Sequence, residues 1–326
     1  MTTSSDTADL VIPDLIVIGS GIAGLAAAQA AMSAGMSVMV IDKGRRIGGR
    51  VSTRRAHGFT FNHGAQFMTA RSPEFVSLST AAIQNHALAE WHVANRDALC
   101  GIPTMRDFPV YMQRGLDVRQ GIEITDIGRE HDHIILTDKD GQTHMARHLI
   151  VSAPAPQSQR LLADVATNLC ALAGSASYAP CWTGMYGFSD APPPHDSAPV
   201  GDDAGPVGFA LWEADRPGAL AANHALTVQA APGWSQQHLE DDAGDVADAL
   251  LAAWQEASGQ TIGTPVLKAA HRWRYARVVA SASDDAAVTS SCGRIAVAGD
   301  WLGGARIEHA FLSGQRAVAA LITAPN

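Results

Sequence analysis

Three glycines near the amino terminus have the spacing that lets a chain bind the phosphates of a dinucleotide. Gly19, Gly21 and Gly24 form a GxGxxG motif within VIGSGIAGL. The first glycine of such a motif permits a tight turn, the second lets backbone amides approach a pyrophosphate, and the third lets a helix pack closely on a strand. The apolar run LIVI precedes the motif and an alanine-rich helix follows it. This order of strand, turn and helix favours dinucleotide binding over a purely structural turn.

An acidic residue and a second glycine turn follow the next strand. SVMVID predicts that strand, and Asp42 at its end is placed to accept hydrogen bonds from the adenosine ribose. Gly48 and Gly49 stand directly before Arg50, so further backbone amides and a guanidinium could reach the phosphates. A solvated basic loop is the alternative interpretation. We favour the second phosphate-binding turn, which points to FAD rather than NAD.

Length and composition indicate two packed domains of an ordinary globular protein. The 326 residues exceed the roughly 100–200 of a usual domain, and 47% are hydrophobic. The 23 basic and 32 acidic residues give a net charge of −9, which disfavours binding to nucleic acid or to an anionic membrane. No apolar run reaches the roughly 18 residues of a membrane span, and the polar start lacks an export signal. We therefore expect a cytoplasmic protein.

The cysteines show no metal-binding or disulfide pattern. Cys100, Cys170, Cys181 and Cys292 are scattered, with no CxxC pair and no zinc-like spacing. We interpret them as small buried hydrophobic residues, with a redox or flavin-linking role as the alternative. No Ser/His/Asp order and no metal-binding cluster stands out, so we predict no metal site.

The rest of the pattern predicts an α/β fold in which the Rossmann parts are separated along the chain. GIEITDIG and HIILTD alternate apolar and polar residues and predict a small antiparallel sheet, and HLIVSAPAP predicts a strand that prolines end. RIAVAGDWLGG and IEHAFLSGQRAVAALI then predict a late strand and helix. Between them the pattern predicts helices near 158–172 and 241–258, strands near 181–188, 207–212 and 225–230, and a surface loop, APPPHDSAPVGDDAGP.

These elements predict a Rossmann-like FAD-binding domain with an inserted α+β substrate domain that carries a mixed or antiparallel sheet. We assign residues 1–75, 115–157 and 291–326 to the FAD-binding domain, and residues 76–114 and 158–290 to the substrate domain.

Five motifs together resemble those of a known flavoprotein family. VIGSGIAGLAAA with RRIGGRVST is similar to the glutathione-reductase-type flavoproteins of the amine oxidase superfamily. FNHGAQFMTAR at 61–71, HRWRYA at 271–276 and AGDWLGGARIEHAFLSG at 298–314 narrow the resemblance to bacterial renalase-like FAD-dependent oxidoreductases. The first motif is generic to many flavoenzymes, whereas the last three, in this order and spacing, are more specific. The similarity spans nearly the whole chain.

The resemblance implies that these motifs hold FAD non-covalently. Gly299 and Asp300 would approach the phosphate and ribityl region, and a helix starting near 307–310 would point its N-terminus at the isoalloxazine. A helix N-terminus carries roughly half a positive charge and free N–H groups, which suit the negative charge of reduced flavin. The predicted cofactor-binding residues are Gly19, Gly21, Ile22, Ala23, Gly24, Asp42, Lys43, Gly49, Arg50, His63, Gly64, Ala65, Gln66, Gly299, Asp300, Glu308, His309 and Ala310.

The HRWRYA and NHGAQF segments supply candidates for the active site. On a strand, His271, Trp273 and Tyr275 share one face, which could line a flat pocket or simply join the core. His63 and Gln66 could bond to flavin or to a nicotinamide carboxamide, or could cap the local backbone. The predicted catalytic residues are His63, Gln66, His271, Trp273, Tyr275 and His309.

Lys268 is the obvious candidate for the lysine that amine oxidases place near the flavin. On an alternating strand it would face away from Trp273, so we expect it to be solvated. Glu308 could be a first-turn acid that matches the dipole of its own helix.

The resemblance implies a flavin oxidase that takes hydride from the 2- or 6-dihydro isomers of β-NAD(P)H onto N5 of FAD and reduces O2 to H2O2. Dihydropyridines lose hydride readily because the loss restores an aromatic pyridinium, so the site mainly has to hold the ring flat. The expected partners are this small-molecule substrate and O2. An FAD-dependent amine oxidase is one alternative, and a non-catalytic flavin-binding protein is another.

Overall fold

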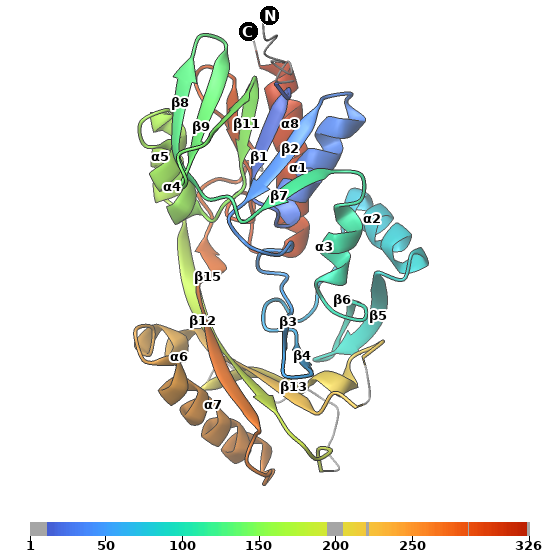
Figure 1. Ribbon diagram of the computed structural model, residues 1–326. Coiled ribbons are helices and arrows are strands. Elements are labelled where there is room, and N and C mark those ends of the chain that lie inside the picture. Colours follow the sequence, from blue (N-terminus) through green and yellow to red (C-terminus); the bar gives the residue numbers. More distant parts are fainter. Residues whose placement is uncertain (1–11, 194–204, 220–221, 286, 325–326) are drawn as a thin grey trace, which may run out of the picture.

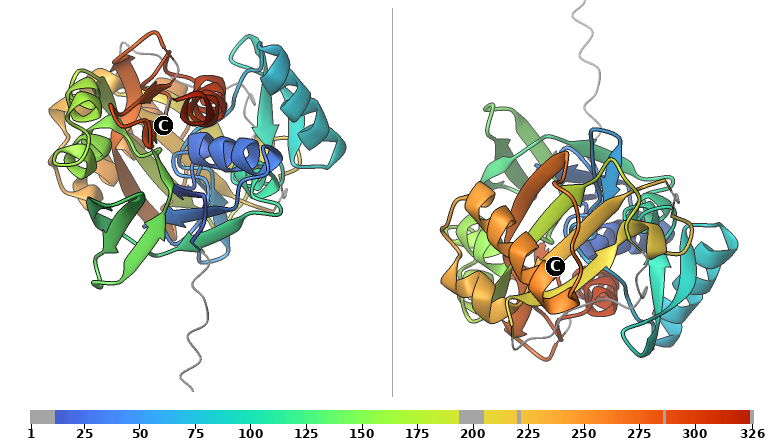
Figure 2. Two further views of the ribbon diagram at one scale, coloured as in Figure 1. Left: turned by 90° about the horizontal axis from the view of Figure 1, so that it is seen from above. Right: turned by 90° about the horizontal axis from the view of Figure 1, so that it is seen from below.

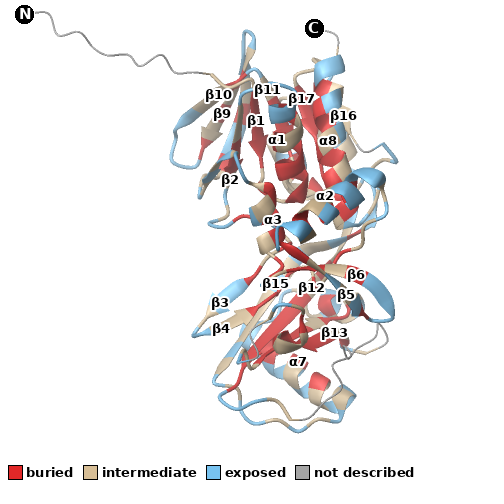
Figure 3. Ribbon diagram, turned by 90° about the vertical axis from the view of Figure 1, so that its right-hand side faces the viewer, coloured by how far each residue is buried: buried red, intermediate tan, exposed pale blue. Residues whose placement is uncertain are grey.

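The computed structural model describes residues 12–193, 205–219, 222–285 and 287–324. The polar start of the chain and the centre of the predicted APPPHDSAPVGDDAGP loop lie outside the described residues. Two layers of structure stand one above the other, joined by two long strands (Figure 1). The buried residues concentrate in these two layers (Figure 3).

A six-stranded, mainly parallel sheet forms the core of the first layer. Its parallel strands, in spatial order, are β17 (Ile295–Val297), β11 (His148–Val151), β1 (Leu15–Ile18), β2 (Val38–Asp42) and β7 (Asp117–Gln120), and β16 (Val288–Thr289) pairs antiparallel at the edge. Every residue of β1 is buried because the strand lies centrally and both faces of the sheet are covered. The continuous apolar run LIVI is the sequence signature of that position.

Alternate residues of β1 face two different cores. Leu15 and Val17 pack with α1 (Ile22–Ser33) and α8 (Ile307–Thr323), which lie side by side when viewed from above (Figure 2). Ile16 and Ile18 pack on the other side. That side is covered by the antiparallel strands β8 (Ile124–Glu130), β9 (His133–Asp138) and β10 (Thr143–Ala146) and by helices α4 (Ala155–Leu162) and α5 (Thr167–Gly174).

The second layer is a four-stranded antiparallel sheet. Its order is β13 (Val207–Trp212), β14 (Ala225–Ala230), β12 (Ser177–Gly187) and β15 (Leu267–Ala280). Helices α6 (Pro232–Gln237) and α7 (Ala243–Ser258) pack on one face, where Trp254 is fully buried and the Tyr186 hydroxyl donates to the Ala247 carbonyl at 2.7 Å. The long strands β12 and β15 extend from this layer toward the parallel sheet (Figure 1).

Two hairpins and three short helices complete the described structure. These elements are β3 (Arg54–Ala56), β4 (Phe59–Phe61), α2 (Pro73–Gln84), β5 (Leu88–Val93), β6 (Arg96–Gly101), α3 (Asp107–Met112) and the 3-10 helix η1 (Glu213–Asp215). None of the described helices is long and apolar enough to cross a membrane.

Most predicted elements are confirmed, but the helix near 158–172 is wrong as a single element. The chain forms α4 and α5, and the extended backbone at Ala166 separates them (φ −149°, ψ 76°). Both helices pack into the same core, so the apolar pattern continues across the break and hides it.

Two segments that we assigned to the substrate domain pack against the parallel sheet instead. Buried residues of α2, β5 and α3 share a core with α1, and those of α4 and α5 share a core with β1. Most of the first segment lies within 76–114 and most of the second within 158–290, although α2 begins at Pro73 and α4 at Ala155. The division into two domains therefore stays a prediction.

Helices α1 and α8 approach closely because α8 carries a glycine at the crossing. A Cβ on Gly314 would lie 2.1 Å from the Ala23 carbonyl oxygen. We expect Gly314→Ala to lower the free energy of unfolding by about 1–3 kcal/mol, since the two helices would have to move apart. Urea unfolding measures the change.

Gly233→Ala is the matched control for this substitution. A Cβ on Gly233, in α6, would meet no atom within 4 Å. This variant should unfold within about 0.5 kcal/mol of the parent. Equal unfolding midpoints for the Gly314 variant and the control would contradict the close-packing argument.

Candidate active site

A cavity of about 1140 Å³ lies between the parallel sheet and the antiparallel sheet. Its first wall comes from residues that follow the carboxyl ends of β1, β2, β7, β11 and β17, and its second wall comes from β12, β13, β14 and β15. Ligands of open α/β sheets bind outside the carboxyl ends of the strands. The volume exceeds the roughly 300–1,000 Å³ of ordinary small-molecule sites, so a dinucleotide fits.

The GxGxxG turn has the geometry of a phosphate cradle. Gly19 adopts a positive φ of 107°, and a Cβ on Gly24 would lie 1.9 Å from the Gly19 carbonyl oxygen. Gly21 lines the cavity, with no atom within 4 Å of its Cβ position. The following helix, α1, has no side-chain cap at its N-terminus, which leaves its first N–H groups to a ligand. Gly24 packs against Gly19 rather than lining the cavity, as its predicted packing role requires.

Asp42 holds the glycine turn against the end of β2. Its carboxylate accepts hydrogen bonds from the backbone N–H of Ser20 at 2.5 Å, the Ser20 hydroxyl at 2.7 Å and the Gly44 N–H at 2.6 Å. A carboxylate has about four acceptor positions, so one position suits a ribose hydroxyl. Beside it, Lys43 lies 3.8 Å from Glu123, and both line the cavity.

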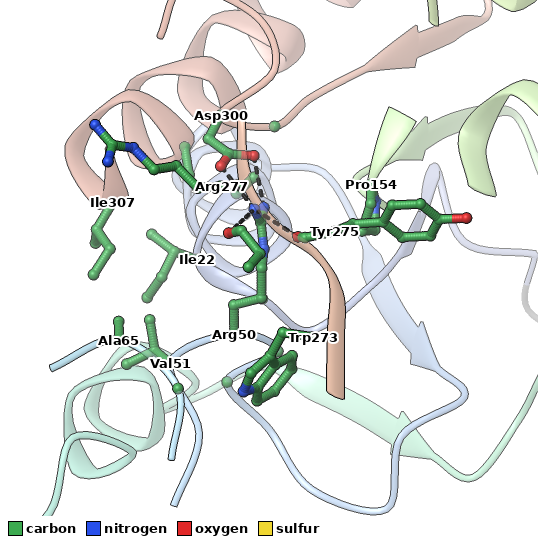
Figure 4. Close-up of a pocket in the computed structure, with 18 of the residues that line it drawn as sticks. Ile22, Arg50, Val51, Ala65, Pro154, Trp273, Tyr275, Arg277, Asp300 and Ile307 are labelled. Carbon is green, nitrogen blue, oxygen red and sulfur yellow. Dashed lines mark hydrogen bonds and ion pairs between the residues drawn. The ribbon is translucent and has the colours of Figure 1, made fainter. Parts of the chain in front are cut away.

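Arg50 forms a bidentate ion pair with Asp300. The guanidinium donates to the two carboxylate oxygens at 2.8 Å and 2.6 Å and to the Ala276 carbonyl at 3.2 Å (Figure 4). Burial alone would lower the pKa of Arg50, but the charge and hydrogen bonds of Asp300 outweigh it and raise that pKa. Arg50 lines the cavity while Asp300 balances its charge, so its contact with the phosphates stays a prediction.

Helix α8 begins at Ile307, as predicted, and its first turn lines the cavity through Ile307 and Ala310. Glu308 does not line the cavity. Its carboxylate is 2% exposed and accepts the backbone N–H groups of Arg71 at 2.8 Å and Ser72 at 2.5 Å. Glu308 therefore ties α8 to the start of α2, a role that corrects its predicted contact with the cofactor.

His309 also lies outside the cavity lining. Its Nε2 is 3.1 Å from an Arg306 guanidinium nitrogen, and its ring packs beside Gly304. The predicted cofactor and catalytic roles of His309 are not supported by this position. A residue next to a helix N-terminus can point away from it, because successive helical side chains are about 100° apart.

A buried ion pair from the second layer fixes the NHGAQF loop. Glu213 and Arg216 are 2% and 4% exposed, and the Arg216 Nε donates to the Glu213 carboxylate at 2.9 Å. Glu213 accepts from the Asn62 backbone N–H and the Asn62 side-chain amide, both at 2.7 Å. Arg216 donates to the Gln66 carbonyl at 2.7 Å and to the Gln66 side-chain oxygen. Gly64 and Ala65, held between them, line the cavity.

Gln66 lines the cavity, but its amide serves the loop itself. The amide nitrogen donates to the carbonyls of Asn62 at 2.6 Å and Gly64 at 3.0 Å, and Arg216 satisfies the amide oxygen. Of the two roles left open for Gln66, the structure favours capping of the local backbone. A catalytic role for its side chain is not supported.

Trp273 lines the cavity, and two histidines support its indole from behind. The His63 ring stacks on Trp273 at 5.3 Å with an interplanar angle of 30°, and the His271 ring contacts it edge-on at 4.4 Å. The Trp273 indole N–H donates to the His63 carbonyl at 2.8 Å. Neither histidine lines the cavity, which corrects their predicted direct contact with flavin or substrate. The indole itself lines the cavity.

Both histidines are held neutral at neutral pH. Burial lowers the pKa of His63 to about 4, with smaller contributions from the charges of His271 and Arg54. Burial likewise lowers the pKa of His271. Neither group is therefore a cation at neutral pH.

Tyr275 lines the cavity beside Pro154 (Figure 4). Its ring contacts Tyr178 edge-on at 5.6 Å, and the Tyr178 hydroxyl accepts the Ala155 N–H at 3.0 Å. The contact links β15 to the start of α4. Tyr275 thus shapes the cavity wall where the two layers meet.

Basic residues outnumber acidic ones in the cavity lining, although the whole chain carries a net charge of −9. The acidic residues of the lining are Asp42, Glu123 and Asp300. The basic residues of the lining are Lys43, Arg50, Arg96, Arg160, Arg272, Arg274, Arg277 and Arg306. Four of the basic residues are paired: Lys43 with Glu123, Arg50 with Asp300, and both Arg272 and Arg274 with Glu240. Such a surface attracts anionic ligands and repels cationic ones.

Lysine and cysteine chemistry is not supported at this site. Lys268 is exposed and pairs with Asp248, which confirms that it is solvated. Cys181 lines the cavity, but burial raises its pKa to about 12, so it is not a thiolate. All four cysteines are free, and the described residues contain no cluster of three or more potential metal ligands.

Sequence reasoning missed several residues of the cavity wall. Ser152 and Pro154 follow β11, and their place beside the glycine turn could have been expected because the ends of parallel strands meet at one edge. Phe209 and Gln229 carry no such signal. Glu213 and Arg216 are also invisible in the sequence, because their partners lie about 150 positions away.

Comparison with known proteins agrees with this geometry. The model of the NAD(P)-binding Rossmann-like domain matches residues 17–78, and the model of the flavin containing amine oxidoreductase family matches residues 86–322. The second match covers more than half of the chain. The protein therefore belongs to the flavin containing amine oxidoreductase family, which implies a flavin cofactor and an oxidoreductase.

Curated relatives match only short segments of this chain. Polyamine oxidase 3 of Oryza sativa subsp. japonica is 45% identical over 56 residues, which is 17% of this chain and 12% of that protein. Protoporphyrinogen oxidase 2 of Arabidopsis thaliana is 30% identical over 108 residues, 33% of this chain and 18% of that protein. The chain thus spans less than a fifth of the length of these relatives.

Solved structures show the same fold over most of the chain. Putrescine oxidase bound to putrescine superposes with a TM-score of 0.70 at 13% identity, covering 96% of this chain and 100% of that one. A putative protoporphyrinogen oxidase from an Exiguobacterium species superposes with a TM-score of 0.69 at 14% identity, covering 94% and 97%. At these identities the likeness establishes the amine oxidase fold and not a shared substrate.

The pKa of His63 generates a prediction about stability. Its value of about 4 in the fold lies below the ordinary 6.5, so the unfolded chain binds a proton first as the pH falls. The contribution of the neutral His63 ring to the free energy of unfolding is complete above pH 6.5 and is lost as the pH falls toward 4. Through His63 the parent should lose about 2–3 kcal/mol of its free energy of unfolding between pH 7 and pH 4.5, and we expect His63→Phe to lack this loss. Urea unfolding at both values measures it.

His92→Phe provides the control for this experiment. His92 lies on the exposed hairpin of β5 and β6, where it pairs with Asp97. This variant should lose as much stability on acidification as the parent. An unchanged loss in the His63 variant would show that the buried ring does not resist protonation.

Proposed function

We propose that this protein is a renalase-like FAD-dependent oxidase that converts the 2- or 6-dihydro isomers of β-NAD(P)H into NAD(P)⁺. The observation that carries the proposal is the positive lining of a cavity that joins the glycine turns to Trp273. A glutathione-reductase-type dinucleotide site and non-covalent FAD are part of the same proposal. The Asp42 and Gly21 region suits the adenosine and phosphate end, and the first turn of α8 suits the ring end.

The charge of the cavity separates the two substrate classes. Amines such as polyamines and putrescine are cations at neutral pH. Among the described residues, four arginines of the lining have no ion pair with a carboxylate, and they would repel such cations: Arg96, Arg160, Arg277 and Arg306. A dihydronicotinamide dinucleotide carries a negative pyrophosphate, which the same lining attracts. The alternative of an amine oxidase fits the family equally well, and the pyrophosphate of FAD would use part of the basic lining in either case. The remaining unpaired arginines favour an anionic substrate.

The positions of the lysines also favour a dihydronicotinamide. The chain has three lysines, and all of them fall within the described residues. Lys43 lies at the adenosine end, while Lys139 and Lys268 are exposed and absent from the cavity lining. None of them could hold a water near the flavin ring. A dihydropyridine needs no such group, because loss of hydride restores its aromatic ring.

The residues of the chain would then bind and orient the two rings. FAD, when bound, would accept the hydride and pass two electrons to O2, giving H2O2 with a proton from solvent. Trp273 would offer a flat wall to the nicotinamide, and His63 and His271 hold that indole in place. The uncapped N-terminus of α8 would favour negative charge on the nearby ring.

A non-catalytic role for FAD is the weaker alternative. The glycine cradle and the aromatic residues Phe67, Phe209 and Trp273 line one and the same cavity. A flavin that served only as a structural element would be sealed by side chains rather than face such a space. We therefore favour a site that admits a substrate.

Anaerobic reduction of the flavin tests the proposed function. Mixing the purified, FAD-loaded protein with borohydride-reduced NAD⁺ isomers should bleach the flavin absorbance within seconds, because hydride transfer from the isomers is favourable. Putrescine and benzylamine should leave it yellow. Bleaching by the amines and not by the isomers would establish the amine oxidase alternative instead.

Two substitutions separate cofactor binding from substrate orientation. Asp42→Ala should yield protein without FAD, because it removes both a ribose partner and the anchor of the glycine turn. Trp273→Ala should keep the yellow cofactor but slow bleaching by the isomers about tenfold or more, since the nicotinamide loses its flat wall. Absorbance spectra and stopped-flow traces measure both. A colourless Trp273 variant would show that the indole supports the fold rather than the substrate.

A further inference from the structure

An aromatic pair and an arginine lie together on the cavity wall away from the glycine turns. The Phe67 and Phe209 rings are 6.1 Å apart with an interplanar angle of 53°, and the Arg96 guanidinium carbon lies 5.5 Å from the centre of the Phe67 ring. All three line the cavity and keep part of their surface exposed. Among the described residues, Arg96 has no acidic partner, so its charge is available to a ligand.

The surrounding structure holds these three side chains in place. Arg96 is the first residue of β6, directly after a tight turn in which Ala94 and Asn95 have φ of 50° and 56°. Met68, the neighbour of Phe67, exchanges backbone hydrogen bonds with Leu99 of β6 at 2.9 Å and 2.8 Å. The hairpin and the end of the NHGAQF segment are therefore joined.

Phe209 is part of the sheet that carries Trp273. Phe209 pairs with Gln229, and the side chain of Gln229 donates to the Gly64 carbonyl at 2.6 Å. Trp273 pairs with Cys181 of β12, and Cys181, Gln229 and Phe209 all line the cavity. The wall thus runs across the sheet from β15 through β12 and β14 to β13.

The strand spacing gives the length of this wall. Neighbouring strands lie about 4.8 Å apart, so the three steps from β15 to β13 span about 14 Å. One aromatic ring cannot reach from Trp273 to Phe209. A ligand that contacts both Trp273 and Phe209 must carry two ring systems joined by a linker. The positive charge of Arg96 favours a negative group near the second ring.

We propose that Phe67, Phe209 and Arg96 form a subsite for the adenosine phosphate half of the dinucleotide substrate. The two phenyl rings contact the adenine, and the Arg96 guanidinium pairs with the adjacent phosphate. The subsite is distinct from the adenosine end of the FAD site, which lies at Asp42 on the parallel sheet. This inference rests on the proposed function, because it names the second half of that substrate.

Binding of ADP-ribose tests the subsite without any redox reaction. Titration calorimetry with the FAD-loaded protein should detect binding of ADP-ribose, and both Arg96→Ala and Phe209→Leu should weaken it about five- to tenfold. Nicotinamide mononucleotide, which lacks adenosine, should bind equally to all three proteins. Arg119→Ala, an exposed arginine on β7 that pairs with Asp117, is the matched control and should bind ADP-ribose like the parent.

Steady-state kinetics provide a second measurement on the same variants. Both substitutions should raise KM for the dihydro isomers of NADH about five- to tenfold and leave kcat within twofold. KM for the corresponding dihydronicotinamide mononucleotide should not change. Retention of the flavin absorbance in each variant shows that the fold is intact.

The outcomes distinguish this inference from the proposed function. Equal binding of ADP-ribose by the parent and both variants, or no binding by any of them, overturns the subsite. If ADP-ribose binding depends on Arg96 and Phe209 while no dihydro isomer bleaches the flavin, the subsite stands and the proposed oxidase activity falls.

Discussion

The ion pair between Arg50 and Asp300 is the interaction on which the rest of the site depends. It joins the second glycine turn to the loop after the last parallel strand, and Arg50 also donates to a carbonyl of β15. Three segments that are distant in sequence are thereby brought to one wall of the cavity. Loss of one partner would leave an uncompensated charge in a mostly buried place, which is costly. The pair therefore organises the two layers around one space.

The opposite wall depends on a second buried pair. Glu213 and Arg216 form hydrogen bonds with the backbone and side chains of the loop that carries Gly64 and Gln66. The same loop holds Trp273, because the His63 carbonyl accepts the indole N–H. Both pairs are positioning devices rather than reacting groups. Histidines that were candidates for chemistry have the same function, since they are neutral and pack behind the indole. These buried residues thus support the cavity wall that Trp273 lines.

Electrostatics supports the proposed substrate class within the family. Membership in the flavin containing amine oxidoreductases is compatible with several substrates, and the solved relatives share only the fold at 13–14% identity. In a protein of net charge −9, basic residues gathered at one cavity attract an anionic ligand to that cavity.

The sequence by itself determined the features that depend on local geometry. The GxGxxG turn, Asp42 at the end of β2, the strand at 225–230 and the start of α8 follow from spacing, turn chemistry and apolar periodicity, which act over a few residues. Only the tertiary structure decided which side chains face the cavity. It turned Glu308, His309, His63 and His271 away from the cavity and brought Ser152, Phe209 and Arg96 to it. For Glu308 and His63 the physical reason is that their directions are set by partners more than 200 positions away, the Ser72 amide and the indole of Trp273, which no local pattern records.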